Sequence, residues 1–124
     1  MLVTVRSVTG PSPQWVSCES SLGVLVAVWR GDTTPHVGSQ HDVEMDAVGA
    51  LVWSDGARIV DADGANEHGQ ALTGLVQEVE ADSLVVRIGD SVVLLEVAGE
   101  PPLGVVGGAV TVRPSRFELW PTNT

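Results

Sequence analysis

The stretch of sequence that decides the fold is LTGLVQEVEADSLVVRIGDSVVLLEV, residues 72–97. It holds three short runs rich in valine and leucine, at residues 72–79, 84–88 and 92–97. Two turn-forming segments separate these runs, EADS at residues 80–83 and Gly89-Asp90. Short β-branched runs bounded by such residues predict antiparallel strands joined by tight turns. We therefore expect a meander of three strands here.

The same pattern extends in both directions from this stretch. Fourteen glycines and seven prolines interrupt the chain at short intervals. No long segment shows the 3.6-residue periodicity of an amphipathic helix. Further strands are expected at residues 2–6, 14–19, 22–29, 41–47, 51–53, 57–60, 105–113 and 117–120.

Many short strands at close spacing are typical of a barrel or a sandwich. We expect an all-β fold: a small, partly open barrel of the OB type at residues 40–121, with an added N-terminal hairpin at residues 1–30. A β-sandwich is the alternative. Gly74 in one strand and Gly107-Gly108 in another suit the tight curvature of barrel strands. A chain of 124 residues is the size of a single domain.

The negative net charge of the chain disfavours partners that are themselves negatively charged. Sixteen acidic residues against six basic ones, all arginines, give a net charge of −10 at pH 7. Affinity for nucleic acids and for anionic membranes depends on basic side chains, so both partners are disfavoured.

The sequence shows a single cysteine, no signal peptide, and no apolar run longer than residues 24–29. These features predict a cytoplasmic protein.

The sharpest local feature is the alternating triplet Asp42-x-Glu44-x-Asp46. On a strand, its three carboxylates share one face, about 7 Å apart along the chain. Such a row can be a docking face for a basic partner, a site for a hard cation, or a solvated face that discourages edge pairing. The docking interpretation predicts contact through this strand.

Other acidic and aromatic residues are candidates for the same interface. An exposed tryptophan is a typical interface anchor, and Trp53 ends an expected strand. The segment at residues 61–67 resembles the start of a calcium loop, but its glycine falls at position four and position twelve is a leucine. It is therefore expected to be a surface loop. The candidate partner-binding residues are Asp42, Glu44, Asp46, Trp53, Asp61 and Asp63.

The sequence shows none of the common catalytic motifs. It contains neither a Gly-x-Ser-x-Gly elbow nor a phosphate-binding glycine-rich loop. The three histidines, His36, His41 and His68, lack a standard ligand spacing, and no feature supplies Cys18 with a histidine partner. We expect a protein without catalytic activity, metal ion or cofactor.

The C-terminal half carries a resemblance to a known group of proteins. Its segments GLVQEV (residues 74–79), RIGD (87–90), LE (95–96) and FELWP (117–121) lie within residues 40–121. This half resembles the small acidic bacterial β-barrel proteins that act as immunity proteins of polymorphic, interbacterial toxin systems. The resemblance implies a non-enzymatic protein that binds a cognate basic toxin, possibly a nuclease, and blocks its active site.

A second function stays open from the sequence. An OB-type module could bind nucleic acid or oligosaccharide. That interpretation needs basic side chains gathered on one barrel face, with Arg87, Arg113 and Arg116 as the candidates.

Overall fold

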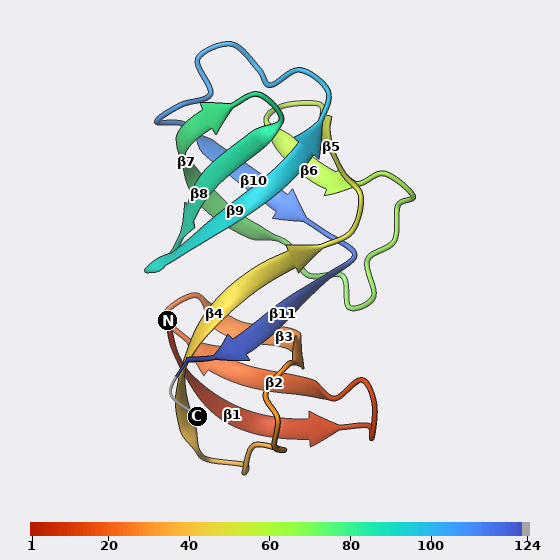
Figure 1. The fold of residues 1–124 in the computed structure, drawn as a ribbon, viewed down its shortest axis with the longest axis vertical. Helices are drawn as coiled ribbons and strands as arrows, with labels where there is room; N and C mark the ends of the chain where they lie inside the picture. Colours follow the sequence, from red (N-terminus) through yellow and green to blue (C-terminus); the bar gives the residue numbers. More distant parts are fainter. Residues whose placement is uncertain (123–124) are drawn as a thin grey trace. The chain divides into compact units, whose positions relative to one another are not determined.

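The computed structural model describes residues 1–122, in which the chain forms eleven β-strands and no helix. The strands close into barrels, so the expected all-β barrel class is confirmed. Two compact units emerge from the contacts: Met1–Asp46 with Phe117–Thr124, and Ala47–Arg116. We call the barrels of these units the first barrel and the second barrel (Figure 1).

Five strands make the first barrel: β1 (Leu2–Thr9), β2 (Trp15–Ser20), β3 (Gly23–Trp29), β4 (Gln40–Val48) and β11 (Arg116–Pro121). Their order around the barrel is β1-β2-β3-β11-β4, and β4 closes the barrel on β1. β3 and β11 are parallel, whereas β1, β2 and β3 form an antiparallel meander. This is the Greek-key arrangement of an OB barrel. Alternate residues fill its core, among them Val5, Cys18, Leu25, Phe117 and Leu119.

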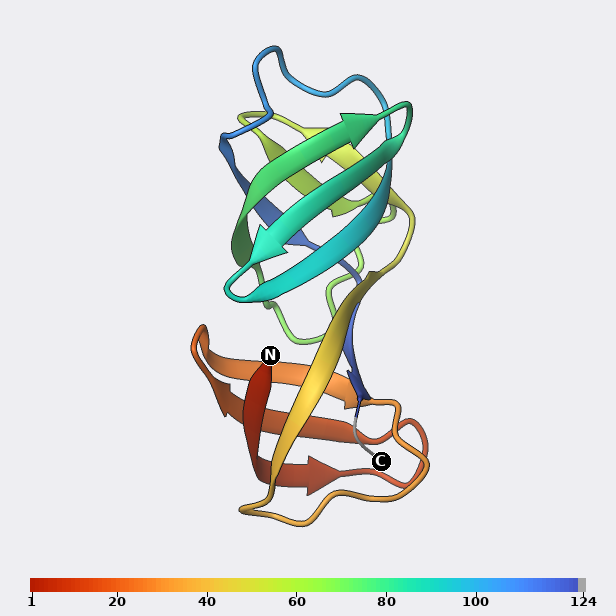
Figure 2. The same cartoon turned by 60° about the vertical axis from the view of Figure 1, so that its left-hand side comes forward.

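Six strands make the second barrel: β5 (Leu51–Ser54), β6 (Arg58–Asp61), β7 (Leu72–Glu80), β8 (Ser83–Ile88), β9 (Ser91–Ala98) and β10 (Ala109–Arg113). Their order is β10-β6-β5-β9-β8-β7, closed by the pairing of β7 with β10. The expected meander is present as β7, β8 and β9, which lie side by side in Figure 2. Inward valines, leucines and isoleucines such as Ile59, Val86 and Leu95 fill the interior.

Gly74 allows two strands of the meander to approach closely. A Cβ at this position would lie 2.5 Å from Cγ1 of Val86 and 2.8 Å from the carbonyl oxygen of Arg87 on β8. The interruption of the ladder lies two residues further on, between Val76 and Glu78. Gly74 therefore lets β7 pack closely against β8, and the bulge in β7 lies at Val76–Glu78 and not at the glycine.

The location of the barrels differs from the sequence-based expectation. Residues 1–30 were expected to form a hairpin beside a partly open barrel at 40–121; their strands instead belong to a closed barrel with β4 and β11. Sequence patterns identify strands but do not show which distant strands pair, because pairing depends on long-range contacts.

One expected strand is shorter than predicted. The run at residues 105–113 becomes a strand only from Ala109. Gly107 has a φ of 83°, and the amide of Gly108 donates to the carbonyl of Val105, so residues 105–108 form a turn. Gly107 and Gly108 therefore lie outside the strand they were expected to curve.

Within residues 1–122, no helix has the length and apolar character needed to cross a membrane.

Candidate functional site

The three carboxylates of the acidic triplet do share one face of β4. Asp42, Glu44 and Asp46 are exposed, and they alternate with the buried Val43 and Met45. The alternation arises because successive side chains of a strand point to opposite sides. The sequence-based prediction of the strand and of its outward acidic row is confirmed.

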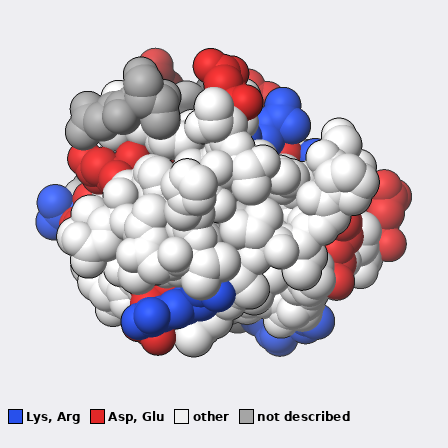
Figure 3. Space-filling view, turned by 90° about the horizontal axis from the view of Figure 1, so that it is seen from below, with Lys and Arg blue, Asp and Glu red and all other residues white. Residues whose placement is uncertain are grey.

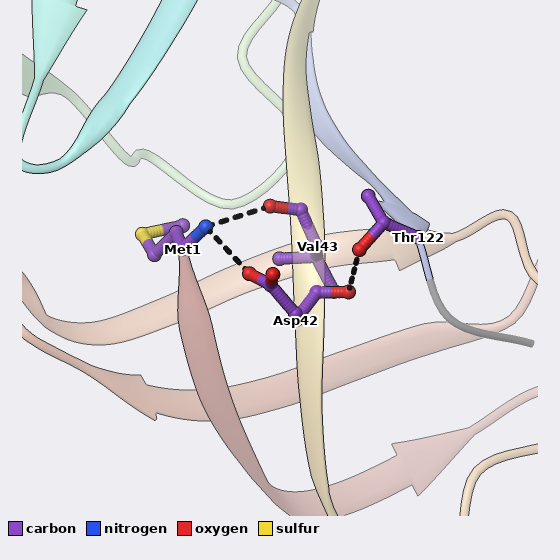
Figure 4. Close-up of polar contacts among 4 residues, drawn as sticks. All are labelled: Met1, Asp42, Val43 and Thr122. Carbon is purple, nitrogen blue, oxygen red and sulfur yellow. Dashed lines mark hydrogen bonds and ion pairs between the residues drawn. The ribbon is translucent and has the colours of Figure 1, made fainter.

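Asp42 has a cationic neighbour that the sequence pattern could not indicate. The amino group of Met1 lies 3.0 Å from its Oδ1 and also donates to the carbonyl of Val43 (Figure 4). On the opposite side of β4, the hydroxyl of Thr122 donates to the carbonyl of Asp42. The Asp42 carboxylate thus holds the start of β1 against β4, and the Asp42 carbonyl holds the end of β11. Glu44 and Asp46 make no ion pair within residues 1–122.

An exposed tryptophan lies beside this acidic row. The amide of Thr122 donates to the carbonyl of Asp42, which sets the register between β11 and β4. The two strands run in opposite directions (Figure 1), so Trp120 falls level with Glu44. Directly opposite residues of an antiparallel pair share a face. Trp120, 41 % exposed, therefore stands next to the carboxylates on the outside of the first barrel.

Arg30 orders this tryptophan. Its guanidinium lies over the Trp120 ring, 5.1 Å from the centroid. Its Nε is also 3.8 Å from Oε1 of Glu118, a buried carboxylate on the same strand as the ring. The ring attracts a cation over its face, so the contact favours this orientation of Trp120. Exposed tryptophans were expected to be interface anchors, but Trp120 was not among the predicted site residues, because only the strand register brings it next to Glu44.

We define the acidic face as Leu2, Asp42, Glu44, Asp46 and Trp120. Leu2 belongs to it because it pairs with Asp42 across β1 and β4 and is 56 % exposed. On the side seen in Figure 3, charged residues lie towards the rim and the middle of the surface is uncharged. The acidic face combines one aromatic group, one aliphatic group and three carboxylates.

Trp53 belongs to a different part of the molecule. It lies on β5 of the second barrel and is half-buried. Its niche, which is also lined by Val79, Asp82 and Pro101, has room for little more than a water molecule. The structure does not bring Trp53 together with the acidic triplet on one barrel.

Asp61 also departs from its expected role. Its side chain is buried, with only 6 % of the residue exposed. Oδ2 accepts hydrogen bonds of 3.1 Å from the amides of Asp63 and Ala65. This carboxylate shapes its own loop and has no free surface for a partner, while Asp63 is exposed. Short aspartate side chains commonly organise turns in this way, and the spacing alone does not distinguish that role from binding.

The hydrogen bonds of His41 are not those of a general base. Nε2 of His41 lies 2.8 Å from Oγ of Ser39, and the Ser39 hydroxyl donates to the carbonyl of His36. Because the hydroxyl has only one proton, the imidazole must donate to the serine oxygen, the reverse of what a general base requires. The ring of His41 also packs edge-on against Trp29, with centroids 4.9 Å apart. Within residues 1–122, no three metal-binding side chains are grouped.

Cys18 is equally unsuited to nucleophilic chemistry. It is fully buried in the first barrel. Burial in apolar surroundings raises the pKa of its thiol to about 11, so the reactive thiolate is scarce at neutral pH.

Comparisons of the chain with protein-family models, with curated proteins and with solved structures find no match.

Proposed function

We propose that this chain is a non-enzymatic binding protein that docks a basic protein through the acidic face of the first barrel. In the form the sequence resemblance suggests, it is an immunity protein and the partner a cognate toxin. The observation that carries the proposal is the position of Trp120 level with Glu44, within a row of exposed carboxylates.

The composition of the face suits a cationic protein surface. Carboxylates attract a basic partner over a distance and speed its association. Tryptophan supplies the apolar contact area that dominates many interfaces. A toxin that cleaves nucleic acid needs a positive cleft to hold phosphates, and an acidic face competes for that cleft.

The test uses a basic protein that co-purifies with the tagged chain from its source organism, or a toxin-like domain where a neighbouring gene encodes one. Its association rate with the purified chain is measured at low and at physiological salt. We expect Glu44→Ser/Asp46→Ser to slow association about tenfold at low salt and to flatten the salt dependence. Trp120→Ala should mainly speed dissociation, at a cost of about 2 kcal/mol in affinity.

The matched control removes two exposed carboxylates of the second barrel, Asp55→Ser/Asp90→Ser, with the same change in net charge. Asp42 is left intact because it pairs with Met1. Equal slowing by both pairs would show that only net charge matters and would reject the acidic face. Unchanged kinetics in all variants would reject it as well.

The strand order of the first barrel favours a second candidate function, oligosaccharide binding by an OB module. Nucleic acid is a poorer ligand for this barrel, because Arg6 is paired with Glu19 and Arg30 with Glu118. A glycan array, with Trp120→Ala as the comparison, tests the sugar-binding alternative. Binding of sugars that is lost in this variant would favour it over protein docking.

A further inference from the structure

We propose that the outer face of β7, β8 and β9 is the contact surface of a homodimer, in which Arg87 of one copy lies between Glu80 and Glu96 of the other. This proposal concerns the second barrel and does not depend on the proposed function.

The outer face of the meander exposes an unusual amount of aliphatic surface. Leu75 is 52 % exposed, Val92 is 59 % exposed and Leu94 is 65 % exposed. Val85, which pairs with Leu94, is half-buried on the same side. The three strands form one continuous wall in Figure 2. Adjacent exposed aliphatic side chains of this kind often mark a contact surface.

The charged groups of this face lack partners. The guanidinium of Arg87 makes no ion pair or hydrogen bond within residues 1–122, although Arg87 is exposed and central. The carboxylates of Glu78, Glu80 and Glu96 are likewise exposed and without an ion pair in the described chain. The face therefore presents a guanidinium and several carboxylates, none of which has an ion-pair partner within residues 1–122.

The strand registers arrange these residues in three parallel rows. We call them the arginine row, the middle row and the acidic row; they consist of Leu75, Arg87 and Val92, of Glu78, Val85 and Leu94, and of Glu80, Ser83 and Glu96. In each row, the first residue is on β7, the second on β8 and the third on β9. Arg87 and the two carboxylates of the acidic row thus lie on opposite sides of a middle row that holds two aliphatic residues and Glu78.

A two-fold axis along the middle row makes this pattern self-complementary. The rotation places the acidic row of one copy over the arginine row of the other, and the reverse. Arg87 then faces Ser83 of the second copy, with Glu80 and Glu96 one strand spacing, about 4.8 Å, to either side. Val85 and Leu94 meet their own counterparts. A symmetric interface requires such a surface that complements itself.

A second copy fits this face better than an unrelated partner of one charge sign. A basic partner would place positive charge against Arg87, and an acidic partner would place negative charge against the glutamates. Repulsion between two chains of charge −10 acts against the dimer, but salt screens it beyond about 8 Å. Since the patch is small, we expect a dimer with a dissociation constant in the micromolar range, roughly 1–100 µM.

One like-charge contact remains in this arrangement and offers a sensitive probe. Glu78 ends the middle row, so the two-fold axis places it beside Glu78 of the second copy. Glu78→Gln should therefore tighten the dimer about two- to threefold, whereas most surface substitutions at an interface weaken or spare it.

The decisive experiment is sedimentation of the purified chain over a range of concentrations. We expect the wild type to pass from monomer to dimer, and Arg87→Glu to raise the dissociation constant at least tenfold. Combining Arg87→Glu with Glu80→Arg and Glu96→Arg reverses the pattern without changing its symmetry, and should restore the dimer. Arg113→Glu is the control, because this arginine is exposed on β10, outside the three rows.

A wild type that stays monomeric at every concentration overturns the proposal and leaves the face for a different protein. Equal weakening by Arg113→Glu and Arg87→Glu also overturns it. Circular dichroism shows whether each variant is folded; if the triple variant is not, Glu78→Gln decides the matter, since an unchanged or weaker dimer contradicts the arrangement.

Discussion

The two barrels are built alike inside and differ on the outside. In both, valines and leucines alternate inward along short strands. On the first barrel, the acidic face carries carboxylates around one exposed tryptophan. On the second barrel, the meander carries exposed aliphatic side chains, with one unpaired arginine at one end of the face and carboxylates towards the other.

This difference shows that the inward–outward alternation of a strand requires apolar side chains only at its buried positions. The outward half is free to carry different chemistry, since it contributes little to the core. A face of one charge sign suits a partner of opposite charge, and a face with both signs in complementary order suits a copy of itself. Variants of each barrel should therefore behave differently, and the largest effect is expected in the core of the second barrel.

Gly74→Val should disrupt the second barrel most strongly. The new side chain would overlap Val86 and the carbonyl of Arg87, so β7 and β8 could not keep their spacing. We expect a loss of about 3 kcal/mol or more in the free energy of unfolding, measured in urea. Thr73→Val, on the neighbouring outward position, is the control and should change stability by less than about 0.5 kcal/mol. A loss below about 1 kcal/mol for Gly74→Val would contradict the close packing.

Alkaline pH should weaken the first barrel through Cys18. The thiol has a pKa of about 11 in the folded chain, above its ordinary value of 9.0. Between these two pH values, the unfolded chain releases the proton and the folded chain keeps it, so stability falls as pH rises. The loss is about 2 kcal/mol at pH 11 and reaches about 3 kcal/mol in full above that pH.

The sequence makes this titration unusually clean. The chain has no tyrosine, and all of its basic side chains are arginines, so Cys18 is the one side chain that titrates in this range. Urea unfolding at a series of pH values from about 9.5 to 11 measures the effect. Cys18→Ala should abolish the slope, and a slope that persists in this variant would assign it to another cause.

Substitution of Asp61 should destabilise the second barrel, whereas substitution of Asp63 should not. Asp61→Ala removes the acceptor of two backbone amides, and we expect it to cost about 1–3 kcal/mol. Asp63→Ala should leave stability within about 0.5 kcal/mol of the wild type, because its side chain is exposed. Thermal unfolding compares the two; equal effects would show that the loop does not depend on the Asp61 carboxylate.

These expectations also show how far the sequence can be interpreted. Its patterns predicted the meander and the outward carboxylates of β4, because strand periodicity is local. They could not predict that β1 and β11 flank β4, since those pairings join residues far apart in the chain. For the same reason, Trp120 was not recognised beside Glu44. Asp61 was grouped with the partner-binding candidates because local spacing does not distinguish a carboxylate that organises its own turn from one that faces solvent.

The smallest expected effect is the most informative about the acidic face. Neutralising Glu44 and Asp46 as Glu44→Gln/Asp46→Asn removes repulsion between like charges about 7 Å apart on one strand. We expect this variant to be more stable than the wild type by about 0.5 kcal/mol in low salt, with the gain shrinking as salt rises. The same variant should bind its basic partner more slowly.

A gain in stability together with a loss in binding would show that the first barrel keeps these carboxylates at a cost to its own folding, as functional residues commonly do. Arg87→Ser is the comparison on the second barrel. It removes an arginine without an intramolecular partner, so the stability of the monomer should hardly change. If Glu44→Gln/Asp46→Asn instead lowers the urea midpoint, the two carboxylates stabilise β4, and the docking role must rest on Trp120 alone.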